Sequence, residues 1–337
     1  MIEYRQTAIP LSDPLETAQG VVDHRDCFLV HSTDPDGVGE ASPLPGWTES
    51  VRETKAALDR VGGSTDRAGP RELDSLLETP AARHGVSLAL LDGESRNAGK
   101  PLYRYLGADA PVETVPANAT IGDGDVTTTV TAAESARADG FGCLKIKVGS
   151  RRVEADIERV EAVRDRLPDV DLRLDVNGAW TRSQAQRAIE QLRTMDIDYL
   201  EQPLVPDDLQ GHVELRGPID IAVDESMRAI DLDEIISAEA ADVIVVKPMI
   251  VGGIDRARPL ATRARTAGLE VVISNTIDGV IARTGAVHLA ASLMPIAPCG
   301  LATADRLETD LAPDPAPVEN GTLPVPQGPG VGVEVTW

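Results

Sequence analysis

Between residues 113 and 303, short β-rich runs alternate with helical stretches, and this alternation constrains the fold more than any other feature. Strands that alternate with helices form parallel sheets, and eight parallel strands close into a barrel. We therefore predict an α/β fold, a TIM-type barrel with (β/α)7β order. The eight runs are ETVPANATI (113–121), CLKIKVG (143–149), LRLDVNG (172–178), YLEQPL (199–204), IAVDES (221–226), DVIVVKP (242–248), EVVISNT (270–276) and APCGLAT (297–303).

One unit of the barrel departs from the pattern. Elsewhere the linking stretches carry apolar residues at helical spacing, and Thr181 is a candidate N-cap for one of them. Between Asp208 and Pro218, however, Gly211 and Gly217 leave little room for a helix. We expect this connection to be irregular.

The regions on either side of the barrel have different patterns. Residues 1–112 contain β-meander segments followed by two helical patterns, around 48–61 and 71–107, which predict an α+β domain. Residues 304–337 are rich in proline and glycine, but valines alternate from Val331 to Val335, ahead of Trp337. Alternation is typical of a half-buried extended segment. We expect residues 304–337 to pack back on the first domain and complete it.

Composition excludes several function classes. The net charge of −23 disfavours nucleic acids and anionic membranes as partners, and no apolar run approaches the length of a membrane span. The N-terminus has no basic stretch followed by an apolar one, as a secretory signal would, so we expect a cytoplasmic protein. The acidic residues are spread along the whole chain, which indicates adaptation to salt. Cys27, Cys143 and Cys299 are widely spaced and indicate buried thiols. A homo-oligomer is compatible with this sequence, which does not determine the number of subunits.

Charged residues stand at the ends of five consecutive strand runs. A parallel barrel gathers the C-terminal ends of its strands at one mouth, where active sites lie. Only five of the 32 basic residues are lysines, and three of these five lie in the set, which indicates a property that arginine lacks, the loss of a proton. The set comprises Lys145, Lys147, Asp175, Glu201, Asp224, Glu225 and Lys247.

The carboxylates of this set predict a metal site. Asp175, Glu201 and Asp224 would repel one another at a barrel mouth unless a cation lay among them. Oxygen ligands without histidine or cysteine suit Mg²⁺. For Glu225 we favour a supporting contact to Lys247 over a place among the ligands. Asn177 and Gln202 either hydrogen-bond to the metal ligands and orient them, or serve only as turn residues.

The lysines predict proton-transfer chemistry. Lys145 and Lys147 are two residues apart on one strand, so both point into the barrel. Two neighbouring ammonium groups near a divalent ion would lower each other's pKa. Lys247, four strands away, would face Lys147 across the pocket. A small carboxylate substrate could bind the metal, lose its α-proton to a lysine, and leave an enediolate stabilised by the metal.

These motifs resemble the muconate-cycloisomerase branch of the enolase superfamily over nearly the whole chain. KIKVG, LDVNGAW, YLEQPL, VDES and VKPMIVGG are similar to its barrel motifs, and GEASPLPGWTES is similar to its capping-domain substrate loop. The resemblance implies that Asp175, Glu201 and Asp224 bind Mg²⁺, with Mn²⁺ as a substitute. It also implies that Lys147 is the base and then the acid, that Lys145 assists, and that Lys247 acts as a cation.

Within this branch, CGLAT at the eighth run resembles the o-succinylbenzoate synthases. That likeness implies a lyase, which converts 2-succinyl-6-hydroxy-2,4-cyclohexadiene-1-carboxylate to o-succinylbenzoate by syn dehydration in menaquinone biosynthesis. An N-acylamino-acid racemase or dipeptide epimerase of the same fold is the alternative, although dipeptide epimerases carry an Asp-x-Asp pair at this strand. A non-catalytic barrel is a third hypothesis, against which the intact lysines and carboxylates argue.

The resemblance also suggests substrate contacts. Two loops of the first domain, residues 12–20 and residues 43–48 with Trp47, are expected to close over the pocket. The far side is expected to be lined by Ser274, Asn275, Thr276 and Gly300, although capping explains the first two equally well. Backbone N–H groups after Thr276 could hold a carboxylate if they open a helix.

Overall fold

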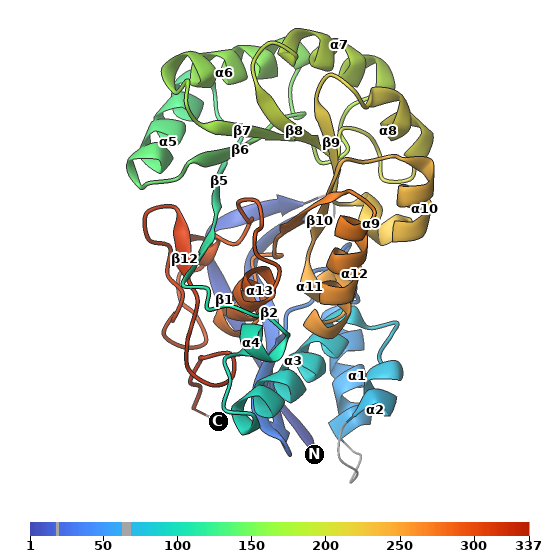
Figure 1. The fold of residues 1–337 in the computed structure, drawn as a ribbon, viewed down its shortest axis with the longest axis vertical. Helices are drawn as coiled ribbons and strands as arrows, with labels where there is room; N and C mark the ends of the chain where they lie inside the picture. The colour runs from blue at the N-terminus through green and yellow to red at the C-terminus, as the bar shows by residue number, and fades with distance from the viewer. Residues whose placement is uncertain (18–19, 63–68, 337) are drawn as a thin grey trace.

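A computed structural model describes residues 1–17, 20–62 and 69–336. Its largest sheet has seven parallel strands that curve into a barrel in chain order (Figure 1). This arrangement confirms the predicted α/β fold. The strands are β5 (Asn118–Ile121), β6 (Cys143–Lys147), β7 (Asp171–Asp175), β8 (Ile197–Glu201), β9 (Asp220–Val223), β10 (Val243–Val246) and β11 (Glu270–Ile273).

The eighth run closes the barrel without forming a strand. Instead, Cys299 makes an isolated parallel bridge to Ala117 at one edge of the sheet, and Gly300 makes another to Ser274 at the other edge. The eighth run of the predicted (β/α)7β barrel is therefore present as two isolated bridges. Prolines at positions 295 and 298 and the glycine at 300 explain this, because proline removes a ladder donor and glycine weakens extended structure.

Helices cover the outside of the barrel (Figure 1). The connection after β8 includes a helix of seven residues, so its predicted irregularity was wrong; Asp208 caps that helix by accepting from the Gly211 N–H at 3.0 Å. The helices are α5 (Val126–Ala138), α6 (Val153–Arg166), α7 (Arg182–Leu192), α8 (Leu209–Leu215), α9 (Ser226–Ala229), α10 (Leu232–Ala238), α11 (Pro248–Val251), α12 (Ile254–Thr266) and α13 (Val280–Ala291).

Strand periodicity sorts side chains between the helices and the barrel interior. On β6, Leu144 and Ile146 join the main apolar core under the helices, so Lys145 and Lys147 point inward. Below the mouth, Tyr199, Ala222, Val243 and Val272 form an apolar cluster, and the guanidinium of Arg173 lies against the Tyr199 ring. The lysines and carboxylates at the C-terminal ends of the strands lie above this cluster.

The first domain packs a three-stranded antiparallel sheet on helices (Figure 1). A Cβ at Gly37 would lie 2.3 Å from the Ala89 carbonyl oxygen, and one at Gly39 would lie 2.1 Å from that of Gly85, so only glycine permits this approach. The elements are β1 (Ile2–Thr17), β2 (Gly20–Thr33), β3 (Asp36–Ala41), α1 (Val51–Gly62), α2 (Pro70–Asp74), α3 (Pro80–Asn97) and α4 (Leu102–Tyr105).

The C-terminal segment contacts the start of the barrel and the first domain. Its strand β12 (Thr322–Pro324) pairs with β4 (Thr114–Pro116), after a short 3₁₀ helix, η1 (Ala304–Arg306). Further on, the Val331 N–H donates to Asp92 of α3 at 2.7 Å, and Val331 and Val333 are buried. The segment thus packs on α3, while Trp337 lies outside the described residues.

Two simpler sequence expectations can be compared with the described residues. None of their helices is both long enough and apolar enough to cross a membrane. All three cysteines are buried free thiols, as the spacing indicated.

Candidate active site

Lysines and carboxylates meet at the mouth of the barrel. The Lys147 ammonium donates to Asp175 Oδ2 at 2.6 Å, and Lys145 Nζ lies 3.0 Å from the same oxygen. Lys145 also donates to Glu201 Oε1 at 2.9 Å, and Lys247 donates to Asp224. Parallel register aligns Lys147 with Asp175 and Asp175 with Glu201. The fold thus brings together six of the residues that the sequence placed at strand ends.

Burial and charge set the protonation of this cluster. Burial lowers the pKa of Lys145, but the charges of Asp175 and Glu201 outweigh it and raise that pKa well above its ordinary value. The lowering that was expected beside a divalent ion stays a prediction, because among the protein's own charges the carboxylates dominate around Lys145. Burial and the charge of Asp175 raise the pKa of Glu201 to about 7, whereas the two lysines outweigh burial and lower that of Asp175.

The donor set has the chemistry of a magnesium site. Asp175, Glu201 and Asp224 are at most 5 % exposed, and their oxygens are the hard ligands that Mg²⁺ prefers. Burial, and after it the charge of Asp175, raise the pKa of Glu201, and a divalent cation bound there would favour its ionised form. Among the described residues, however, no group of three such side chains is disposed to hold a metal, and ammonium groups contact the oxygens of Asp175 and Glu201. Magnesium binding here remains a prediction.

Polar residues support the cluster from behind. Asn177 accepts from Lys147 Nζ at 2.8 Å and donates to Glu225 Oε1 at 3.0 Å, so it joins those two side chains. The expected support of Lys247 by Glu225 stays a prediction: Glu225 accepts from Asn177, and the charge of Lys247 favours its ionised form. Gln202 Oε1 accepts from the Asp224 N–H at 3.0 Å and therefore fixes the end of β9.

Trp47 covers one side of the pocket. Lys247 Nζ lies 4.1 Å from the centroid of its indole ring, within the range at which the ring face attracts a cation. The Trp47 loop therefore reaches the catalytic lysine candidates, as expected for a capping loop. The other expected loop, residues 12–20, belongs to the β1–β2 hairpin, where Ser12 donates to the Asp305 carbonyl at 2.9 Å; residues 18–19 lie outside the described part.

The far side of the pocket is tied together by its own side chains. Ser274 donates to the Gly300 carbonyl at 3.1 Å, and a Cβ at Gly300 would lie 2.7 Å from Ser274 Oγ. Asn275 donates to Thr303 at 2.9 Å, and Thr276 donates to the Asp278 carboxylate. These contacts hold the closing segment against β11. Direct contacts of these residues with substrate remain predictions.

The start of α13 does not offer a free anion site. The Gly279 and Ala282 N–H groups donate to Glu40 at 2.7 and 3.0 Å, and the Val280 N–H donates to Asp310 at 2.8 Å. The protein's own carboxylates thus occupy the N–H groups that we expected to hold a substrate carboxylate. Burial raises the pKa of Glu40 to about 7.

Comparison with known proteins identifies the family. A family model described as "Enolase C-terminal domain-like" matches residues 128–337. The chain belongs to the enolase superfamily. It is therefore a barrel of an enzyme superfamily, as the similarity of its motifs to those of that superfamily implied.

Relatives within the superfamily have different activities. The chain is 30 % identical to the L-Ala-D/L-Glu epimerase of Bacillus subtilis (strain 168), over 98 % of this chain and 95 % of that protein. It is 42 % identical to the o-succinylbenzoate synthase of Thermobifida fusca (strain YX), over 65 % of this chain and 69 % of that protein. A dipeptide epimerase from Enterococcus faecalis V583, solved with Mg and the dipeptide L-Leu-L-Tyr, matches with a TM-score of 0.89 at 30 % identity, covering 99 % and 98 % of the two chains.

Sequence reasoning missed several buried charged residues of this superfamily member. Arg173, two residues before Asp175, lies 4.7 Å from the Tyr199 ring centroid and donates to the Pro298 carbonyl at 2.6 Å. Strand parity alone would have placed it inside the barrel. Arg25 and Glu40 carry no such signal, because neither stands at a barrel strand end and their contacts with the barrel, to Ile277 and Gly279, span more than 200 residues of sequence.

Proposed function

We propose that this enolase-superfamily enzyme is an o-succinylbenzoate synthase. The reaction removes water from 2-succinyl-6-hydroxy-2,4-cyclohexadiene-1-carboxylate and yields o-succinylbenzoate. The proton on the carbon that bears the carboxylate is removed, the neighbouring C–OH bond breaks, and the ring becomes aromatic.

The closing segment of the barrel is the observation that carries this proposal. Residues 297–303 contain no aspartate or glutamate, so this segment presents no carboxylate to the pocket. Cys299 and Leu301 are buried, and Thr303 accepts a hydrogen bond from Asn275. Dipeptide epimerases are expected to hold the substrate ammonium with an Asp-x-Asp pair at this position. A substrate without an ammonium group fits the segment better, and its sequence resembles that of the synthases.

Accessibility supports Lys147 as the base. Its side chain is 34 % exposed, whereas those of Lys145 and Lys247 are 12 % and 11 % exposed. Asn177 Oδ1 and Asp175 Oδ2 orient the Lys147 ammonium at the pocket surface. Lys147 Nζ would take the ring proton and return it to the departing hydroxyl on the same face, so one residue performs both transfers.

Lys247 has a different environment. It lies between Asp224 and the face of Trp47, both of which stabilise a positive charge at Nζ. We assign it the role of a fixed cation beside the negative charge that develops on the substrate. Lys145, held by Glu201 and Asp175, would keep those carboxylates in place.

Magnesium would be held by Asp175, Glu201 and Asp224. Bound there, the ion would supply positive charge to the substrate carboxylate and so acidify the neighbouring C–H bond. The family and the solved relative with Mg support this assignment.

A second candidate is a racemase or epimerase. The full-length similarity to the L-Ala-D/L-Glu epimerase and the two lysines of the pocket favour it. In that reaction Lys147 and Lys247 would act as bases on opposite faces of the substrate carbon.

Arginine substitutions separate the two candidates. In a one-base dehydratase, Lys147→Arg should lower kcat by about 10²–10⁴-fold, because arginine cannot accept the proton. Lys247→Arg should retain measurable dehydration, because it keeps the charge. Lys55→Arg is the control, since Lys55 pairs with Asp59 on the surface of α1.

Both substrate classes should be assayed with Mg²⁺. Aromatic product formation is followed with the cyclohexadiene substrate, and exchange of the α-proton in deuterated water is followed with each enantiomer of an N-acylamino acid. Efficient exchange from both enantiomers with negligible dehydration, blocked equally by both arginine variants, would refute the synthase assignment in favour of the racemase.

A further inference from the structure

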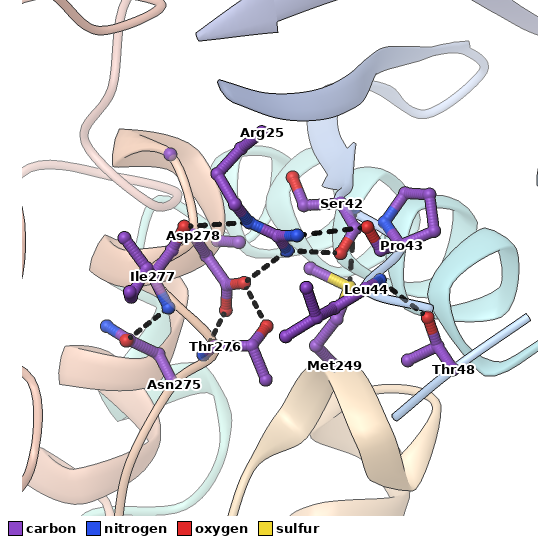
Figure 2. Close-up of polar contacts among 12 residues, drawn as sticks. Arg25, Ser42, Pro43, Leu44, Thr48, Met249, Asn275, Thr276, Ile277 and Asp278 are labelled. Atoms are coloured by element: carbon purple, nitrogen blue, oxygen red, sulfur yellow. Dashed lines mark hydrogen bonds and ion pairs between the residues drawn. The ribbon is translucent and has the colours of Figure 1, made fainter. Parts of the chain in front are cut away.

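A buried arginine of the first domain joins the two sides of the pocket. Arg25 on β2 is only 2 % exposed. Its guanidinium donates to the carbonyls of Ser42 at 2.9 Å and Pro43 at 3.1 Å, and to that of Ile277 at 3.2 Å (Figure 2). One side chain therefore ties the end of the first-domain sheet to the segment that follows β11.

The first pair of bonds fixes the start of the loop that carries Trp47. The Ser42 N–H also donates to the sulfur of Met249, two residues after Lys247, at 3.5 Å. Beyond Pro43 the chain makes a tight turn, in which the Trp47 N–H donates to the Leu44 carbonyl at 2.9 Å. The turn therefore starts directly after the two residues that Arg25 holds.

Thr48 closes this turn from inside. Its hydroxyl accepts from the Leu44 N–H at 2.9 Å (Figure 2). The position of the indole over Lys247 therefore depends on two links in series, the Thr48 contact within the turn and the Arg25 contact at its base.

The third bond holds a residue in an unfavourable conformation. Ile277 has φ of 59°, a left-handed conformation that a β-branched residue rarely adopts. Its N–H donates to Asn275 Oδ1 at 3.0 Å, and its carbonyl accepts from Arg25, so hydrogen bonds on both sides of the residue keep it there. Arg25 thereby helps to fix the backbone that presents Ser274, Asn275 and Thr276.

Charge favours the same arrangement. Asp278 Oδ1 lies 3.9 Å from the Arg25 guanidinium, and the same carboxylate accepts from Thr276 Oγ1 (Figure 2). A planar guanidinium can donate in several directions within one plane. A lysine side chain carries a single ammonium group, which cannot replace all three contacts with the carbonyls.

We propose that Arg25 is a positioning residue that sets how tightly the pocket binds its carboxylate substrate, by holding the Trp47 turn and residues 274–277 at a fixed separation. The proposal rests on the proposed pocket but not on which superfamily reaction takes place there. Lys147 lies on β6, Asp175 on β7 and Asn177 just after β7, and the hydrogen bonds of Arg25 go to none of them. Loss of Arg25 should therefore affect substrate binding more than proton transfer.

The test compares Arg25→Lys with Arg83→Lys. Arg83 is a matched control, because it is 5 % exposed and also joins the first domain to the barrel, through the Gly252 carbonyl at 2.6 Å and Asp255 at 2.7 Å. We expect Arg25→Lys to raise KM about tenfold, the equivalent of one ordinary hydrogen bond, while kcat changes less than about threefold. Arg83→Lys should leave KM within about twofold.

A second measurement needs no substrate. In a chain whose other two tryptophans are replaced by phenylalanine, acrylamide quenching of Trp47 fluorescence should increase with Arg25→Lys and stay unchanged with Arg83→Lys. Quenching does not depend on which reaction the enzyme catalyses. Failure of the synthase assignment can therefore be told apart from failure of the Arg25 proposal.

Three outcomes would overturn the proposal. One is unchanged KM and quenching in Arg25→Lys, and another is equal changes in Arg83→Lys. If Arg25→Lys does not fold, Thr48→Val tests the other link of the series, and with it whether the position of the Trp47 turn affects substrate binding, because it removes the hydroxyl that closes the turn and leaves Arg25 in place. Unchanged KM and Trp47 quenching in Thr48→Val would be the third outcome.

Discussion

Acid should destabilise the protein through one buried histidine of α13. His288 has no exposed surface, and its ring stacks on Tyr103 with centroids 5.9 Å apart. The Tyr103 N–H donates to Nδ1 at 3.3 Å, and Nε2 donates to the Val331 carbonyl at 3.0 Å. Protonation would therefore place two N–H groups against each other at Nδ1. Burial lowers the pKa of His288 to about 4.

The sign and size of the effect follow from linkage. Between pH 6.5 and about 4, the unfolded chain binds a proton that the folded chain excludes, so stability is complete above this window and is lost as the pH falls through it. At about 1.4 kcal/mol per pH unit, the full loss is about 3 kcal/mol, of which about 2 kcal/mol falls between pH 7 and pH 5.

Urea unfolding followed by circular dichroism can isolate this contribution. His288→Gln keeps a donor for Val331 and an acceptor for Tyr103 but does not titrate, so the stability of the wild type relative to this variant should fall by about 2 kcal/mol from pH 7 to pH 5. His24→Gln is the control with the opposite sign, because Asp23 raises the pKa of that exposed histidine. A change below about 0.5 kcal/mol for His288→Gln would refute the reasoning.

Two further predictions concern metal and salt. A chelator should abolish activity and Mg²⁺ should restore it, and Asp224→Asn should weaken the response to Mg²⁺; full activity of the chelated protein would exclude the metal site. The net charge of −23 should destabilise the fold at low ionic strength, and screening lengths fall from about 30 Å at 0.01 M to about 3 Å at 1 M. The thermal unfolding midpoint should therefore rise with KCl, and a midpoint that falls or stays constant would contradict this.

The strand-end residues were predictable because their positions depend on local rules. A side chain in a strand alternates with a period of two, and parallel strands in a barrel end at the same mouth. These rules place Lys147, Asp175 and Glu201 together without knowledge of any contact, and the register of β6, β7 and β8 agrees. The same rules could have placed Arg173 inside the barrel.

What the sequence by itself determined is therefore the alternation of strands and helices, the inward parity and the charges at the mouth, all of which depend on residues near one another in the chain. Only the tertiary structure decided that residues 297–303 close the barrel as two isolated bridges, that Glu40 caps α13, and that Arg25 joins the Trp47 turn to Ile277. It also decided that the pKa of Lys145 rises. The physical reason is that electrostatic energies and hydrogen bonds depend on distances in space, and the contacts of Arg25 with Ile277 and of Glu40 with Gly279 join residues more than 200 positions apart in the sequence.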